Sequence, residues 1–252
     1  MIFNFNNAPT RVEKEVSLTD SIFNYEHPFV CTDAAVFTIK TRESDSYRKL
    51  PDISLRILLY RRSVEPYQSK WCLPGGFLNI DETPVDNIRR KIFEKSNVSE
   101  CYLEQLYTFC ELNRDPRARV ISVSYLGLIN EIESKRFDSE TTWFTVGYDS
   151  AQRSVFQNDK NSLSEPDFGF DHYHIIQTAL ERLRSKILYT NIIFNLLPTE
   201  FTLTQLQNVY EIILGKKDQA ANFRRKIIDL VQGTGRLTSD KGHRPAELYT
   251  KR

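Results

Sequence analysis

The chain has 252 residues, 40% of them hydrophobic and 27% charged, a balance that excludes wholesale disorder and is typical of a globular protein. No apolar run reaches the roughly 18–20 residues that would span a bilayer, and the first residues lack the pattern of a secretion signal. The net charge of +1 is uneven, because residues 201–252 hold ten Lys or Arg against five Asp or Glu, which is +5 and leaves about −4 for residues 1–200. This asymmetry indicates either a basic module that binds nucleic acid or a solvated charged tail.

The first predicted elements are two strands. Residues 34–39 and 55–60 are short, apolar and partly β-branched, which is the pattern of buried strands. The polar stretch 41–52 between them contains a proline and is predicted to be a loop. Residues 71–77, WCLPGGF, are predicted to form a strand that runs into a Pro-Gly-Gly turn.

A helix is predicted to follow this turn. Thr83 is a good N-cap, and Pro84 suits the first helical position. Ile88 and Ile92 lie about one turn apart on the same face. The helix is expected to end near Asn97, because asparagine tolerates the left-handed conformation that closes many helices.

Two further strands and a polar stretch complete this half of the chain. Residues 120–129 give the strongest strand pattern of the sequence, and residues 143–146 give a shorter one. Residues 149–169 are polar with weak periodicity. The mixture of strands and helices indicates one α/β or α+β domain.

The pattern then becomes helical. Apolar residues at helical spacing predict one helix around 176–187 and another around 203–213. Thr202 and Gln205 have the spacing of a capping box before the second helix, and Gly215 is placed to close it.

The end of the chain has the proportions of a winged helix-turn-helix. After Gly215 a further helix is predicted over 219–232, and a basic, glycine-rich hairpin follows with its turn near residues 240–242. In such a motif the second helix enters the major groove of DNA. A helical domain with a solvated charged face is the alternative interpretation.

Basic and amide side chains on the last helix and the hairpin predict the contacts with DNA. Arginine reads guanine edges, asparagine reads adenine, and lysine commonly holds phosphate. The predicted DNA-binding residues are Asn222, Arg224, Arg225 and Lys226 on the helix, and Arg236, Lys241 and Arg244 on the hairpin.

The segment 76–98 resembles the Nudix box, the signature of a family of diphosphate hydrolases, and WCLPGGF at 71–77 resembles the family's approach to the box. The positions that match are Gly76, Glu82, Arg90, Ile92, Glu94 and Val98. Three positions depart from the pattern. Lys91 and Lys95 stand where the family has glutamates, and Asn97 stands where it has a glycine.

These departures affect the chemistry that the resemblance implies. In the family, the helix glutamates hold magnesium against a diphosphate, and magnesium requires oxygen ligands. Residues 91, 94 and 95 lie on neighbouring faces of one helix, and a protonated lysine has no lone pair to offer a metal. We therefore expect no catalytic residues, no metal site, no cofactor and no enzymatic activity. His172 and His174 stand without nearby acid or cysteine partners and are predicted to be structural.

An active magnesium-dependent Nudix hydrolase, similar to an ADP-ribose pyrophosphatase, is the main alternative. Glu82 and Glu94 are retained, and Glu111 or Asp115 could supply further ligands. Magnesium would be needed only in this case. The two lysines of the box could instead hold a phosphate directly, or they could be plain solvated surface.

Three arginines precede the strong strand at residue 120. Arginine grips phosphates and carboxylates with two parallel hydrogen bonds, although a charged loop held by Asp115 would have the same composition. Together with the box, they give the predicted effector-binding residues Arg114, Arg117, Arg119, Lys91, Lys95, Glu82 and Glu94.

From about residue 30 onward the chain resembles the Nudix-related transcriptional regulators, a family that includes regulators of NAD metabolism and of sugar utilisation. The matching segments are 114–117, 119–122, 170–172, 223–226 and 244–249. Ala118 departs from the family, in which we expect glycine. The resemblance implies an α/β fold class: a Nudix α/β/α sandwich domain at 1–165, then a linker helix and a small winged helix-turn-helix domain at 166–252.

The resemblance also implies a function and partners. Such proteins are homodimers that bind palindromic double-stranded operator DNA, usually as repressors, and they respond to an ADP-ribose-like nucleotide or to a sugar. The residues leave the choice of effector open. A catalytically inert adaptor that binds another protein is a third hypothesis. Four scattered cysteines without a CxxC pair are typical of reduced thiols, so we expect a cytoplasmic protein without a membrane anchor.

Overall fold

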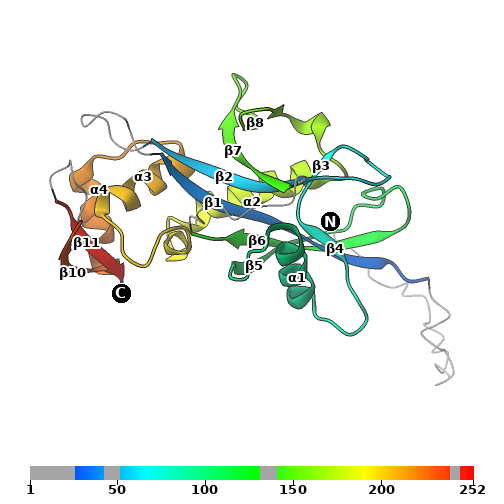
Figure 1. Ribbon diagram of the computed structural model, residues 1–252, viewed down its shortest axis with the longest axis horizontal. Coiled ribbons are helices and arrows are strands. Elements are labelled where there is room, and N and C mark those ends of the chain that lie inside the picture. Colours follow the sequence, from blue (N-terminus) through cyan, green and yellow to red (C-terminus); the bar gives the residue numbers. More distant parts are fainter. Residues whose placement is uncertain (1–25, 43–51, 131–140, 239–244) are drawn as a thin grey trace, which may run out of the picture.

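The main feature of the computed structural model is one mixed β-sheet (Figure 1). Within the described residues, this sheet has nine strands. The structure describes residues 26–42, 52–130, 141–238 and 245–252. The order along the sheet is β5-β6-β1-β2-β7-β8-β9, with β3 beside β2 and β4 beside β1. The strands are β1 (Phe29–Arg42), β2 (Asp52–Arg61), β3 (Trp71–Cys72), β4 (Gly75–Phe77), β5 (Tyr102–Phe109), β6 (Val120–Leu128), β7 (Thr141–Tyr148), β8 (Ser154–Gln157) and β9 (Ser162–Leu163).

Strand β1 organises this sheet. It is antiparallel to β2 and β4 but parallel to β6, with Phe29 opposite Val120 and Asp33 opposite Ser124. Because parallel neighbours begin at the same edge, the loop that leads into β6 lies beside the start of β1. This register brings the arginine-rich loop at 110–119 next to residues near Asp33.

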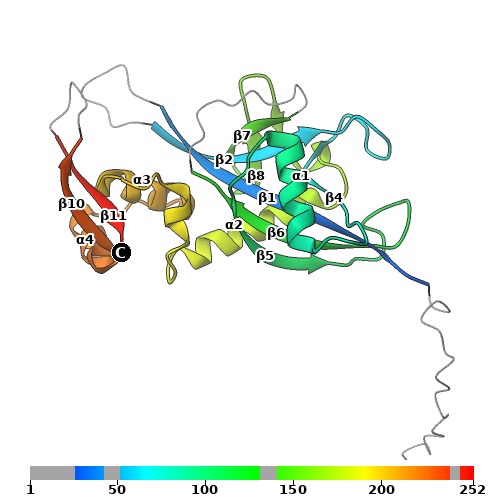
Figure 2. The ribbon, with the colours of Figure 1, turned by 60° about the horizontal axis from the view of Figure 1, so that its bottom comes forward.

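Helices cover both faces of the sheet (Figure 2). Ala34 and Val36 of β1 pack with the residues of α1 on one face, while Ala35 and Phe37 pack with those of α2 on the other. This alternation follows from the two-residue repeat of a strand. The helices are α1 (Pro84–Ser96), α2 (His172–Lys186), α3 (Leu203–Leu214) and α4 (Ala220–Ile227), and the short 3-10 helices are η2 (Glu165–Asp167), η3 (Ile192–Leu196) and η4 (Ile228–Leu230).

The predicted caps of α1 and α3 are confirmed. The Thr83 hydroxyl accepts a backbone N–H of the first turn of α1, and Asn97 ends the helix with a φ of 55°. Before α3, Thr202 and Gln205 form a reciprocal capping box, and Gly215 closes the helix with a φ of 66°. Local side chains therefore determine these helix ends, as the sequence pattern indicates.

The last elements form a helix-turn-helix followed by an antiparallel hairpin of β10 (Val231–Leu237) and β11 (Glu247–Lys251). The predicted helix over 219–232 is wrong at its end, because α4 stops at Ile227 and Val231 already begins β10. Val231 continues the apolar stripe of the helix, but it is buried as the first residue of a strand. The predicted turn at 240–242 lies outside the described residues.

Several strands have no counterpart in the sequence pattern. Strand β5 contains a bulge between Gln105 and Tyr107, which breaks the alternation that would have revealed it. Strands β8 and β9 lie within the polar stretch 149–169. The strands predicted at 34–39, 55–60, 120–129 and 143–146 are present in β1, β2, β6 and β7. The strand predicted at 71–77 is divided into β3 and β4, and the predicted Pro-Gly-Gly turn is wrong, because Gly75 and Gly76 pair with β1 as part of β4.

One continuous hydrophobic core extends from the sheet into the helix-turn-helix. Phe37 on the sheet, Leu183 on α2, and Val209 and Phe223 on α3 and α4 all belong to it. The two parts of the chain therefore share buried apolar surface instead of being joined by a bare linker. None of the helices in the described part of the chain is long and apolar enough to cross a membrane.

Candidate functional site

Glu82, the first carboxylate of the Nudix-like box, is enclosed by hydrogen-bond donors. Arg90 donates to its two oxygens at 2.7 and 3.1 Å, and the Asn87 amide donates at 2.6 Å. These bonds, with that from Arg90 as the strongest, lower the pKa of Glu82 to about 2. The side chain is only 13% exposed, so its lone pairs face donors of the protein itself.

The second carboxylate of the box, Glu94, is paired within the same helix. Arg90 donates to it at 2.7 Å and Lys91 at 2.9 Å. Burial alone would raise the pKa of Glu94, but the bonds from Lys91 and Arg90 lower it. The ammonium of Lys95 lies 4.5 Å from the centre of the Tyr60 ring, in a cation–π contact. Glu82, Arg90, Glu94 and Lys91 therefore form a continuous series of ion pairs, which we call the closed ladder of the box.

This ladder does not fit a magnesium ion, which the Nudix resemblance would imply. Magnesium needs several oxygens with free lone pairs in near-octahedral geometry, whereas both box glutamates are already bound by cations. Asp115 is likewise bound by Arg117, at 2.7 and 2.9 Å. Within the described ranges, no group of three His, Cys, Asp or Glu side chains is placed to hold a metal.

A pocket of about 180 Å³ opens where the start of β1 meets the loop before β6 and the start of α2. Its volume is below the range of about 300–1,000 Å³ that is usual for whole drug-sized ligands, so it would enclose only part of such a ligand. The residues that line it are Cys31, Asp33, Tyr60, Arg62, Gly75, Gly76, Phe77, Arg114, Asp115, Arg117, Val120, Phe170 and His172.

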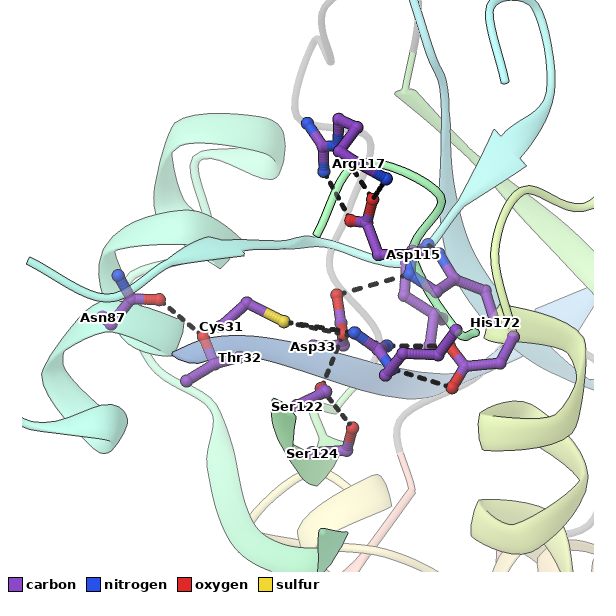
Figure 3. A network of polar contacts seen from close by, with 12 residues as sticks. Cys31, Thr32, Asp33, Asn87, Asp115, Arg117, Ser122, Ser124 and His172 are labelled. Atoms are coloured by element: carbon purple, nitrogen blue, oxygen red, sulfur yellow. Dashed lines mark hydrogen bonds and ion pairs between the residues drawn. The ribbon is translucent and has the colours of Figure 1, made fainter. Parts of the chain in front are cut away.

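The floor of this pocket is a buried network centred on Asp33 of β1 (Figure 3). Asp33 accepts hydrogen bonds from Ser122 at 2.6 Å and from Arg114 at 3.3 Å, and it lies 3.4 Å from Nε2 of His172. Arg114 also donates twice to Asp171, at 2.7 and 3.0 Å. A buried charge needs such complete bonding, because an unpaired one would cost several kcal/mol.

The charge states of Asp33 and His172 follow from this geometry. Burial alone would raise the pKa of Asp33, but its contacts with His172, Arg114 and Ser122 lower it below its ordinary value. For His172, burial opposes the charged imidazolium and the Asp33 carboxylate favours it. The N–H of Leu73 donates to Nδ1 of His172 at 2.9 Å, and a protonated nitrogen cannot accept. We therefore describe His172 as neutral, with its proton on Nε2 toward Asp33.

The mouth of the pocket is cationic and aromatic. The guanidinium carbons of Arg62 and Arg117 lie 5.2 and 5.7 Å from the centre of the Phe170 ring, and Arg117 also lies 5.3 Å from the Phe77 ring. Phe170 has a φ of 55°, a conformation that bulky residues rarely adopt. Guanidinium groups and an aromatic face are suited to a ligand that combines phosphate with a planar base.

The structure places some of the predicted effector-binding residues at this pocket and others elsewhere. Arg114 and Arg117 line it, but Arg119 donates to the Glu111 carbonyl at 2.9 Å and is not among its lining residues. Of the box residues, Glu82 precedes α1, whereas Lys91, Glu94 and Lys95 lie on it, and Lys91 packs against Gly76 at the pocket edge. Their roles in binding a ligand stay predictions.

Four residues of the site were missed by the sequence analysis as binding residues: Asp33, Arg62, Phe170 and His172. A signal existed for Asp33, since it is the one carboxylate in a strand whose first residues are mostly apolar. Phe170 and His172 entered only through the family resemblance, and the structural role predicted for His172 agrees with its buried, hydrogen-bonded position. His174 is exposed and packs edge-on against Phe109.

A second candidate surface is the outer face of α4. Phe223 and Ile227 turn inward and are buried, which leaves Arg224, Arg225 and Lys226 exposed on the helix. Asn222 accepts a hydrogen bond from Arg225 at 2.5 Å. Lys226 binds Asp218 at 2.7 Å. The exposed part of the helix therefore carries basic donors, as is typical of a helix that enters the major groove.

The hairpin beside this helix is only partly described. Arg236 lies on β10, is largely exposed, and forms an ion pair with Glu200. Lys241 and Arg244, which the sequence predicts to contact DNA, lie outside the described residues. The DNA-binding roles of the residues on α4 and on the hairpin stay predictions.

Family models match both parts of the chain. Residues 47–162 match the NUDIX domain model, and residues 193–250 match the model of the NrtR DNA-binding winged helix domain. These matches, with the sheet and helices described above, confirm the predicted fold class, a Nudix α/β domain followed by a winged helix.

Individual relatives agree with these models. The chain is 33% identical over 233 residues to an ADPR-responsive transcriptional repressor of Acinetobacter baylyi, a match that covers 90% of this chain and 83% of the relative. It is 29% identical over 153 residues to an ADP-ribose pyrophosphatase of Methanocaldococcus jannaschii, covering 61% and 73%. Among solved structures, Shewanella oneidensis NrtR in complex with a 27mer DNA superposes with a TM-score of 0.69 at 33% identity, covering 88% of this chain and 93% of that one.

Proposed function

The chain belongs to the NrtR family of Nudix-related transcriptional regulators, and from this premise we propose that it is a repressor that releases operator DNA when an ADP-ribose-like nucleotide binds its Nudix domain. The relative from Acinetobacter baylyi is an ADPR-responsive repressor, and NrtR of Shewanella oneidensis has been solved on DNA. Both relatives match this chain across both of its parts. The proposal therefore concerns the whole molecule.

The observation that carries the proposal is the mouth of the pocket. Arg62 and Arg117 flank the ring of Phe170, and a buried ion-pair network closes the floor below them. A nucleotide diphosphate offers the negative charge that guanidinium groups bind, and its base offers a face for stacking. A neutral sugar offers no negative charge to the guanidinium groups, so the mouth favours the nucleotide over the sugar.

The same premise supports the assembly and the location. We propose that the repressor acts as a homodimer on a palindromic operator, because two-fold symmetric proteins read two half-sites one or more helical turns apart. We also propose that it acts in the cytoplasm, where its DNA target and a nucleotide effector are both present.

Addition of ADP-ribose is expected to lower the affinity of the protein for DNA from its own upstream region by at least about tenfold, a typical size for coupling between two sites. The measurement is fluorescence anisotropy of labelled DNA at fixed salt, since phosphate contacts make binding fall steeply with ionic strength. In Arg117→Met, the concentration of ADP-ribose needed for release should rise about tenfold, because a charge-assisted contact is lost.

Arg119→Met is the matched control for this experiment. It removes the same charge from the same loop, but Arg119 does not line the pocket. An unchanged response in Arg119→Met places the effector at the pocket. Equal loss of response in both variants would show that the whole loop, and not the pocket, binds the nucleotide. Absence of specific DNA binding at low salt would contradict the proposal that the protein is a repressor.

Hydrolysis is the second candidate function, because an ADP-ribose pyrophosphatase is among the relatives. We propose that the closed ladder of Arg90, Lys91 and the two glutamates excludes it. Calorimetry with ADP-ribose should give the same affinity in magnesium and in EDTA, and chromatography should detect no AMP after long incubation. Magnesium-dependent AMP would contradict this, and Glu82→Gln is the control that would distinguish turnover at the box from a contaminant.

A further inference from the structure

Helix α2 begins at the pocket. Asp171 is its N-cap and His172 is its first residue. Both side chains belong to the buried network, since Asp171 accepts two bonds from Arg114 and His172 lies against Asp33. The start of the helix is therefore bound to β1 and to the arginine loop by directed polar contacts, in addition to its packing.

The same helix ends at the helix-turn-helix. Near its last turn, Nε of Arg184 donates to the Ile213 carbonyl of α3 at 3.2 Å. The hydroxyl of Tyr210, also on α3, donates to the carbonyl of Ile187 at 2.8 Å, just after α2. In Figure 2, α2 leads from the sheet toward α3. Its two ends thus hold the pocket and the DNA-binding part.

The helix between these ends is suited to move as one body. It has 15 residues, which at 1.5 Å per residue gives a length of roughly 22 Å. Its buried face, with Ile176, Ala179 and Leu183, belongs to the core that continues into α3. Packed cores shift between discrete arrangements rather than deform continuously, so displacement at one end reaches the other.

Phe170 supplies a point at which a ligand can act on the helix. It stands two residues before His172, holds its backbone at a φ of 55°, and forms part of the pocket mouth between Arg62 and Arg117. A strained conformation of this kind persists only while the surroundings hold it. An anion that draws Arg62 or Arg117 away from the Phe170 ring removes one of the contacts that stabilise this strained conformation.

We propose that α2 transmits effector binding to the DNA-binding part: the ligand at the mouth releases Phe170 and shifts the pinned start of α2, and Arg184 and Tyr210 pass the shift to α3. The identity of the ligand rests on the proposed function, whereas the mechanical connection rests on the contacts of α2. Other polar contacts near the end of α2 lead to the sheet, such as those from Arg182 to the Leu106 carbonyl of β5 at 3.1 Å and from Lys186 to Glu104, and they play no part in the proposed transmission.

The first test measures coupling with the full chain, ADP-ribose and the upstream DNA. We expect ADP-ribose to change DNA affinity by at least about tenfold in the wild type but by no more than about threefold in Tyr210→Phe with Arg184→Met, against a typical range of 5–150-fold. Affinity for ADP-ribose without DNA should stay the same, because the pocket is untouched. Because coupling is reciprocal, DNA must change the affinity for ADP-ribose by the same factor.

Arg182→Met is the matched control, since it removes a guanidinium from the same turn of α2 but breaks a bond to the sheet. It should keep the full coupling. Undiminished coupling in the Tyr210→Phe, Arg184→Met variant would overturn the proposal, as would equal loss in Arg182→Met.

A second test needs neither ligand nor DNA, so it separates the failure of this inference from the failure of the proposed function. Hydrogen exchange is measured on the wild type and on Asp171→Asn, with the amides of α1 as the internal reference for global stability. Exchange should become faster in both the start of α2 and in α3, and in the Tyr210→Phe, Arg184→Met background the effect should stay at the start of α2. Unchanged exchange in α3 of Asp171→Asn would refute the transmission even if ADP-ribose proves to be the effector.

Discussion

Replacement of Arg225 by alanine is expected to weaken binding to the operator by about 5–150-fold, the equivalent of the 1–3 kcal/mol that one specific base contact contributes. Arg225 lies on the exposed face of α4, and the two apolar residues that anchor the helix, Phe223 and Ile227, point away from it. The substitution therefore removes a contact with DNA and leaves the packing of the helix intact. Anisotropy titrations against specific and scrambled DNA measure both affinity and specificity.

Lys160→Ala is the control for Arg225→Ala. It also removes one positive charge, but Lys160 is an exposed residue between β8 and β9. If the two variants weaken binding equally, only net charge matters and α4 does not read the operator. A larger loss on specific DNA than on scrambled DNA in Arg225→Ala alone identifies α4 as the recognition helix. The hydrogen bond from Arg225 to Asn222 makes Asn222→Ala a natural partner for a double-mutant cycle.

The second large effect is expected from Arg114→Met, which should lower the free energy of unfolding by about 3–5 kcal/mol, the usual result of leaving one member of a buried ion pair. Arg114 and Asp33 are only 6% and 5% exposed, so water cannot replace the lost partner. Urea denaturation followed by circular dichroism measures the loss. Arg119→Met on the same loop is exposed and should change stability by less than about 0.5 kcal/mol.

The pH dependence gives this prediction a second signature. The pKa of Asp33 lies below its ordinary value of about 4 in the folded protein, so the carboxylate stabilises the fold above pH 4 and loses this contribution as the pH falls through the lowered pKa. In Arg114→Met the decline should begin at higher pH, because the guanidinium no longer favours the carboxylate. Identical stability and pH profiles in the two proteins would mean that the Asp33 network contributes nothing to the fold.

The helices could be predicted from the sequence because their ends depend on neighbouring residues. Thr83, Thr202 and Gly215 each act within a few positions of the helix they cap. The strands that escaped prediction depend on more distant partners. Strand β5 carries a bulge, and α4 stops where Val231 finds a partner at Lys251 on the far side of the hairpin. The periodicity of the sequence does not predict the pairing of Val231 with Lys251.

The candidate site shows the same division. Arg114 and Arg117 stand out in the sequence because they lie together in one loop. Asp33 and His172 are 139 positions apart, and they meet only because α2 returns to the sheet face beneath β1. The parallel register of β1 with β6 then adds Ser122 to the network. This cluster of residues is brought together by the topology of the fold, so no local sequence motif predicts it.

The shared core has a consequence for how such regulators can be recombined in evolution or by engineering. Helix α2 covers a sheet face that includes Ala35, Phe37 and Ile57, so a cut before Asp171 would expose that apolar face to water and promote aggregation. The interchangeable unit is therefore the sheet together with α2, and the splice point lies beyond Lys186. A new sensor domain grafted onto this winged helix must therefore bring its own helix of the same length and keep the register of that helix's last turn. Otherwise both domains will fold, but ligand binding to the sensor will not change the affinity for DNA.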